Sequence, residues 1–230
     1  VLLLEFSRFL FRSFDSSHFE ALTNCKPFRT LLFLGECVPS INQLPRDLFL
    51  CLKSLRTLDL SGTLVSGLPS SIGCLELLHY LDFSYTPIRI LPRSIETLYS
   101  LQTLKLRDCF ALCSLPPGMR NLTSLRHLDF DIVRQLNFIP KGMGSLTNLQ
   151  TLKAFLVGRE EGCSVEELKD LDNITGTFCI ERLENVENVV EAKKAALKSK
   201  QYITKLKLRW GEHRYKNSKA EMQNLEHLQP

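Results

Sequence analysis

The chain has 230 residues, of which 44% are hydrophobic and 23% are charged, and its formal net charge is +4 at pH 7. This length and composition allow the chain to bury a substantial apolar core. Its apolar runs are short, as at residues 1–4 and 31–34. A membrane-spanning helix, which needs about 20 apolar residues, is therefore excluded.

Residues 1–25 are expected to form an irregular N-terminal segment or a degenerate repeat. The first residue is Val1, not Met, and the first apolar stretch is interrupted by Glu5 and Arg8 without a small-residue cleavage site. We therefore expect no secretory signal peptide. The missing initiator Met leads us to expect that the chain is part of a longer protein.

Residues 26–157 contain regular copies of one apolar pattern with a period of 23 to 24 residues. One copy consists of Leu55, Leu58, Leu60, Thr63, Val65, Leu68, Pro69, Ile72 and Leu75. The same offsets recur from Leu78, and slightly longer copies begin at Leu101 and Leu125. The L-x-x-L-x-L pattern at this period is typical of a leucine-rich-repeat solenoid.

This pattern predicts an α/β fold, a leucine-rich-repeat solenoid with a parallel concave sheet and a helical or irregular convex side. The period-two part of each copy predicts a short strand whose leucines point inward. The Leu-Pro pair begins the return path, because proline fixes its own φ and lacks a backbone donor. Thr63, Thr86 and Cys109 are expected to turn inward after their strands.

The residues between the inward leucines are expected to form one continuous concave surface. Its candidate protein-binding residues are Tyr80, Asp82, Lys105, Arg107, His127, Asp129, Asp131, Lys153 and Phe155. Charges of opposite sign alternate between successive copies, and the aromatic residues are of a type enriched at protein interfaces. A solvated face whose charges pair across neighbouring strands is an equally weighted alternative.

Residues 158–230 are predicted to form longer, irregular repeats that contain helices and are truncated at the C-terminus. Ser164 and Glu167 have the spacing of a capping box. Helical spacing follows over 186–197, and alternating apolar residues predict strands near 178–180 and 203–208.

Positive charge is concentrated in residues 193–219, which hold ten Lys or Arg against Glu212 alone. Lys205, Lys207 and Arg209 form a candidate basic docking surface for a protein or for another part of the same protein. A solvated face is the simplest interpretation. Nucleic acid binding through phosphate contacts and base stacking ranks below both alternatives.

Motifs for catalysis are missing from the sequence, which has no phosphate-binding loop, no G-x-S-x-G and no H-E-x-x-H. The five histidines show no metal-binding spacing with Cys or carboxylates. We therefore predict a protein that is not an enzyme and has no catalytic, cofactor or metal site.

The eight cysteines form no C-x-x-C pair and no terminal cluster, which favours a reducing, cytoplasmic location. Two N-x-T triplets begin at Asn121 and Asn173. We expect both to be unmodified, and a glycan on Asn121 would instead favour an extracellular receptor.

Several segments together resemble the repeat region of plant disease-resistance proteins of the coiled-coil, nucleotide-binding, leucine-rich-repeat family. The first part of the resemblance is LRTLDLSGT at 55–63, LPSSIG at 68–73 and LHYLDFSYT at 78–86. The later part, which is more diagnostic, is LKAFLVG at 152–158, SVEEL at 164–168, GTFCI at 176–180, LENV at 183–186 and LKLRW at 206–210.

This resemblance implies an intracellular immune sensor. In the family, the repeat region holds a nucleotide-binding switch inactive and detects a pathogen effector or a modified host protein. ADP or ATP is then expected only in an upstream switch domain that lies outside this sequence. A free-standing intracellular leucine-rich-repeat adaptor for protein–protein interaction is the alternative.

Overall fold

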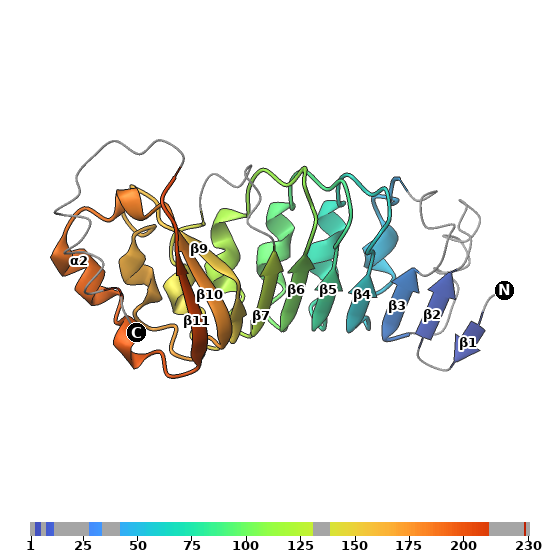
Figure 1. Cartoon of the computed structure of the whole chain (residues 1–230). Helices are drawn as coiled ribbons and strands as arrows, with labels where there is room; N and C mark the ends of the chain where they lie inside the picture. Colours follow the sequence, from blue (N-terminus) through green and yellow to red (C-terminus); the bar gives the residue numbers. More distant parts are fainter. Residues whose placement is uncertain are drawn as a thin grey trace.

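The computed structural model describes residues 3–5, 8–11, 28–33, 42–130, 139–211 and 228. Within these residues, short strands lie side by side along one face of an elongated array, and turns and short helices line the opposite face (Figure 1). This arrangement is the leucine-rich-repeat solenoid that the sequence predicts.

Most strands belong to one sheet whose spatial order follows the sequence. Its strands are β1 (Leu3–Glu5), β2 (Arg8–Phe11), β3 (Thr30–Phe33), β4 (Thr57–Asp59), β5 (Tyr80–Asp82), β6 (Thr103–Leu106), β7 (His127–Phe130) and β8 (Thr151–Leu152). Strands β2 to β8 pair in parallel. A second parallel sheet contains β9 (Ala154–Leu156), β10 (Gly176–Glu181) and β11 (Ile203–Leu208).

In the described residues, the convex side consists of single 3₁₀ turns and one short α-helix. The turns are η2 (Leu48–Leu50), η3 (Ser70–Cys74), η4 (Arg93–Thr97), η5 (Pro117–Asn121), η6 (Met143–Ser145), η7 (Val165–Leu168), η8 (Leu183–Asn185) and η9 (Leu197–Ser199), and the helix is α2 (Val189–Lys194). Pro69, Pro92 and Pro116 are extended residues directly before their turns, with φ between −60° and −68°. Proline suits this place because its φ is preset and no donor is lost.

The repeated leucines form one continuous core. Leu58, Leu81 and Leu104 are fully buried, and each pairs with its equivalent in the next strand. The inward positions after the strands are buried as predicted. Thr63 and Thr86 satisfy their hydroxyls by donating to carbonyls three residues earlier, at 2.7 Å. Cys109 takes the same place in the next repeat and is also fully buried.

The predicted outward position of Phe155 is wrong, because its side chain is only 1% exposed. Phe155 pairs with Ile180, whereas Ala154 pairs with Cys179. Paired residues share a face of a sheet, so Phe155 lies on the face of the buried Ile180. Lys153 belongs to neither β8 nor β9, and one extra residue at this break reverses which side chains face inward.

Two further details differ from the sequence expectations. Part of the N-terminal segment is regular, because β1 and β2 form an antiparallel pair and β2 continues the parallel sheet. Ser164 caps η7 by accepting from the Glu166 amide at 3.3 Å. Glu167 does not complete a capping box, since its carboxylate accepts instead from the Gly144 amide of the preceding repeat at 2.8 Å.

Candidate functional site

The concave surface holds the predicted outward residues in register. Tyr80 pairs with Thr103, which pairs with His127. Two residues further along the same strands, Asp82 pairs with Lys105, which pairs with Asp129. The strands therefore bring together residues that are 23 or 24 positions apart in the sequence. Asp131, which was expected among the protein-binding residues of this surface, lies outside the described residues.

Tyr80, Asp82 and Lys105 form one cluster on β5 and β6. The Tyr80 hydroxyl donates to Asp82 at 2.8 Å, and the Lys105 ammonium lies 3.7 Å from the same carboxylate and 5.1 Å from the Tyr80 ring centroid. Burial raises the pKa of Tyr80. The pKa of Lys105 is also raised, mainly because its ammonium contacts the Tyr80 hydroxyl. Both shifts are upward from values already well above 7, so neither group changes its protonation state near neutral pH.

Asp129 on β7 accepts two cations from neighbouring strands. Arg107 approaches one carboxylate oxygen at 3.0 Å, and Lys153 approaches the other at 2.7 Å. His127, two residues earlier, is hydrogen-bonded to the Thr151 hydroxyl at 3.0 Å. The charges in this part of the face pair across strands, which is the geometry of the solvated alternative. A protein ligand would have to exchange these ion pairs for its own, and the binding role of these residues stays a prediction.

A hollow of about 410 Å³ lies on this face where the two sheets meet. It is lined by Phe130, Thr151, Lys153, Thr175, Thr177, Cys179, Lys207 and Arg209. Lys207 is placed there because it pairs with Cys179 in the β10–β11 register. The structure thus brings Lys153 of the concave surface together with Lys207 and Arg209 of the predicted basic docking surface. The third, Lys205, is exposed on β11 but does not line the hollow.

Three cations surround this hollow, and two of them are already paired. Lys153 is bound to Asp129, and Arg209 is bound to Glu181 at 3.0 Å. Lys207 is exposed and forms no ion pair with any other residue that the structure describes. The hollow is therefore a site with excess positive charge, suited to an anionic group.

Sequence inspection missed the contributions of Thr177 and Cys179 to this hollow. The alternation in residues 176–180 was visible, but the one-residue shift that sets the register with β11 was not. Burial raises the pKa of the Cys179 thiol to about 11, with a further contribution from Glu181. The thiol is therefore protonated at neutral pH, and Cys179 is a lining residue instead of a nucleophile.

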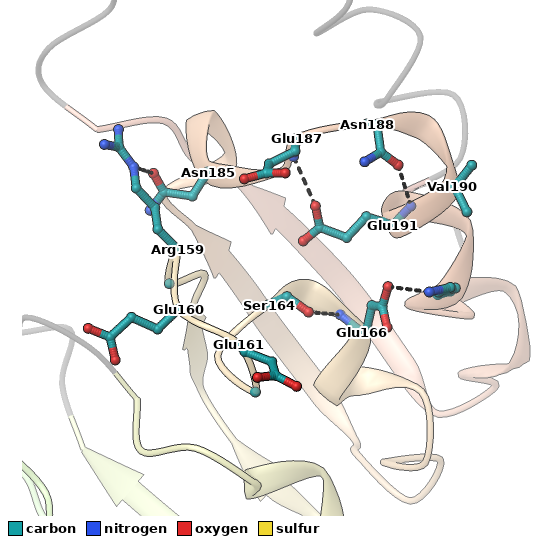
Figure 2. A pocket seen from close by; sticks show the side chains of 13 residues that line it. Arg159, Glu160, Glu161, Ser164, Glu166, Asn185, Glu187, Asn188, Val190 and Glu191 are labelled. Atoms are coloured by element: carbon teal, nitrogen blue, oxygen red, sulfur yellow. Dashed lines mark hydrogen bonds and ion pairs between the residues drawn. The ribbon is translucent and has the colours of Figure 1, made fainter.

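A second hollow, of about 680 Å³, lies between the loop at residues 158–164 and α2 (Figure 2). Glutamates dominate its lining, yet two of them are engaged within the fold. Glu166 binds Lys194 at 2.7 Å, and Glu191 accepts from the Glu187 amide at 2.9 Å (Figure 2). No group of side chains in the described part of the chain is arranged to hold a metal ion. The Glu166–Lys194 pair joins neighbouring repeats, whereas the Glu187–Glu191 contact lies within one segment.

Comparison with known families identifies the repeat architecture over most of the chain. The profile of the family described as leucine-rich repeat region matches residues 71–230, and that described as leucine rich repeat matches residues 54–75. None of the described helices has the length and apolar character needed to cross a bilayer.

Curated relatives of this chain include two disease resistance proteins from Solanum bulbocastanum. The chain is 41% identical to disease resistance protein RGA2 and 41% identical to putative disease resistance protein RGA4, each over 180 residues. These alignments cover 77% of this chain and 18% of each relative. The chain therefore spans less than a fifth of the length of these relatives.

Solved structures with the same fold come from distant proteins. The crystal structure of a TLR13–ssRNA13 complex has a TM-score of 0.59 and 15% identity, and the alignment covers 93% of this chain and 34% of that chain. An internalin, InlF from Listeria monocytogenes, has a TM-score of 0.55 and 16% identity, with coverage of 95% and 57%. At these identities the comparison shows a shared fold.

Proposed function

Because this chain belongs to the leucine-rich repeat region family and is similar to plant disease resistance proteins, we propose that it is the sensing and autoinhibitory repeat region of an intracellular immune receptor. It binds a pathogen effector or a modified host protein, and it restrains a nucleotide-binding switch located elsewhere in the receptor. Exchange of ADP for ATP belongs to that switch. Repeat regions of this type are typically protein-interaction surfaces, and we assign this one no catalytic step.

The observation that carries this proposal is the basic hollow at the end of the concave surface. Lys207 offers an exposed ammonium there, beside the hydroxyl-bearing Thr175 and Thr177. An acidic side chain of a protein partner gains a charge-assisted hydrogen bond without breaking the Lys153–Asp129 or Arg209–Glu181 pairs. The occupant is the effector, the host protein or the receptor's own switch domain.

A cytoplasmic location agrees with the state of the cysteines. All six described cysteines are free thiols, three of them buried. Burial raises the pKa of Cys109, Cys163 and Cys179, which disfavours the thiolate form of each at neutral pH. We propose that the receptor acts in the reducing cytoplasm, where such thiols persist.

The test is charge reversal of Lys207 in the full-length gene product, expressed in leaf tissue. Lys207→Glu is expected to change basal signalling or the response to pathogen elicitation, because an acidic partner group would be repelled. Lys205→Glu is the matched control, since Lys205 is an exposed lysine of the same strand outside the hollow. The transcript upstream of residue 1 is sequenced in parallel to establish whether a phosphate-binding loop precedes the repeats.

Equal signalling by the two variants, at equal protein levels, would remove the hollow from the proposal. If the upstream reading frame lacks a phosphate-binding loop, there is no switch to restrain, and the chain is a repeat-only adaptor.

A further inference from the structure

The segments that follow β4, β5 and β6 carry exposed apolar side chains that the concave-face proposal does not use. We name residues 60–67, 83–90 and 107–114 the ascending segments. They leave the carboxyl ends of adjacent strands along one edge of the array (Figure 1). Four of the nine large, exposed hydrophobic residues in the described part of the chain lie on them: Leu64, Tyr85, Ile90 and Phe110.

Backbone hydrogen bonds hold the ascending segments directly side by side. Near the strand ends, the Gly62 amide donates to the Ser84 carbonyl at 2.8 Å, and the Tyr85 amide donates to the Arg107 carbonyl at 2.7 Å. Further along, the Arg89 amide donates to the Ser66 carbonyl, and the Cys113 amide donates to the Arg89 carbonyl. Side chains that leave these segments outward therefore form one patch three repeats wide.

Two of the four apolar side chains, Leu64 and Phe110, occupy equivalent places in this patch. Leu64 and Phe110 each follow a buried inward residue, Thr63 and Cys109, and are 49% and 64% exposed. Pro87 holds the equivalent exposed place in the repeat between them. Scattered exposed apolar residues are ordinary, but a contiguous row on adjacent segments marks an interaction surface.

Tyr85 places a bulky, exposed side chain on this patch at a turn that does not require one. Its φ is +61°, a left-handed conformation that bulky residues rarely adopt. The equivalent residue of the preceding repeat is Gly62, at φ +72°, which adopts this conformation without steric cost. Tyr85 is also 62% exposed, so core packing does not explain the bulky side chain. Asp108 holds the same place in the following repeat at φ +52°, so the conformation belongs to the repeat turn, and the exposed aromatic ring marks Tyr85 as a contact residue.

The ascending segments carry two arginines, Arg89 and Arg107, against one carboxylate, Asp108, and this net charge of +1 favours an acidic partner. Arg89 and Arg107 are exposed beside the apolar row, and Arg107 meets Asp129 with its side chain still 48% exposed. Arginine beside large aromatic residues is the composition found at the energetic centres of protein interfaces. We propose that the ascending segments of these three repeats dock an acidic protein segment that carries large apolar side chains.

The probe for this surface is a phage-displayed library of random 12-residue peptides, selected on the immobilised full chain. Selection is expected to enrich peptides that combine Asp or Glu with Trp, Phe or Leu. A synthetic peptide of the enriched sequence is then titrated by fluorescence anisotropy. Tyr85→Gly and Phe110→Ser are each expected to weaken its binding about tenfold, as is typical for loss of an aromatic anchor. Arg89→Glu is expected to weaken binding similarly.

Two controls separate this surface from the rest of the molecule. Tyr99→Ser removes a 58% exposed tyrosine outside the ascending segments and is expected to leave peptide binding unchanged. Lys207→Glu alters the concave hollow and is also expected to bind the peptide normally. Circular dichroism confirms folding of Tyr85→Gly, in which glycine relieves the strained backbone. An enriched peptide without acidic residues, or equal binding to wild type, Tyr85→Gly and Phe110→Ser, overturns the proposal.

Discussion

Individual glycines on the convex turns leave space for side chains or backbone of the neighbouring repeat. A Cβ on Gly144 would lie 2.5 Å from the Glu167 carbonyl oxygen, and the Gly144 amide donates to the Glu167 carboxylate at 2.8 Å. Gly144→Ala is therefore expected to lower the free energy of unfolding by about 1–3 kcal/mol, the usual cost of overpacking. Chemical denaturation measures this loss.

The control for this prediction is Gly67→Ala. A Cβ on Gly67 meets nothing within 4 Å, and the residue is exposed. Its substitution is expected to change the unfolding free energy by less than about 0.5 kcal/mol. Equal effects of the two substitutions would show that the Gly144–Glu167 contact does not join the repeats.

A buried lysine links two other repeats and gives the stability a defined pH dependence. The Lys200 side chain is 1% exposed and binds Asp172 at 2.8 Å and the Lys169 carbonyl at 2.9 Å. The hydrogen bond from Lys200 is the main cause of the lowered pKa of Asp172. Because the Asp172 pKa is lower in the folded state than in the unfolded state, the ion pair stabilises the fold fully when the pH is above the unfolded-state pKa. This stabilisation is lost as the pH falls through the folded-state pKa.

Asp172→Asn is therefore expected to be less stable than wild type at pH 7. Because Asp172 is largely exposed, solvent screening limits the difference to about 1 kcal/mol. The difference should shrink as the pH falls below the ordinary carboxyl pKa, and it should vanish below the lowered pKa of Asp172 in the folded protein. Thermal melts of both proteins from pH 7 to pH 3 test this, and a constant difference across the range contradicts the assignment.

At the scale of elements, the break between β8 and β9 places Phe155 in the core, whereas Phe110, far from the break, lies on the surface. Phe155 is 1% exposed, whereas Phe110 is 64% exposed. Phe155→Ala is expected to cost about 3–5 kcal/mol of unfolding free energy, because it leaves a cavity in the core. Phe110→Ala should change stability by less than about 0.5 kcal/mol. Denaturant titration compares the two, and similar losses would contradict the reversed facing at the break.

The same break shows how far the sequence predicts this structure. The strands, the inward leucines and the turns after Leu-Pro follow from the spacing, because every repeat uses one period. The extra residue at Lys153 does not interrupt the spacing of apolar residues in the sequence. The repeat pattern therefore does not show that Phe155 turns inward. The apolar patch at Tyr85 and the hollow at Lys207 were missed because they depend on backbone conformation and strand register.

For the whole molecule, each repeat is stabilised mainly by its two neighbours, so stability should fall toward the edge strand of the second sheet. Leu206 and Leu208 of β11 are only partly buried, while Leu104 and Leu106 of β6 are fully buried. Among the described strands, β11 pairs on one side only, with β10. We therefore expect hydrogen–deuterium exchange measured by mass spectrometry to be fastest in β11 and slowest in β5 to β7, with rates on the order of 100-fold apart. Protection of β11 equal to that of β6 would mean that the described strands open as one cooperative unit.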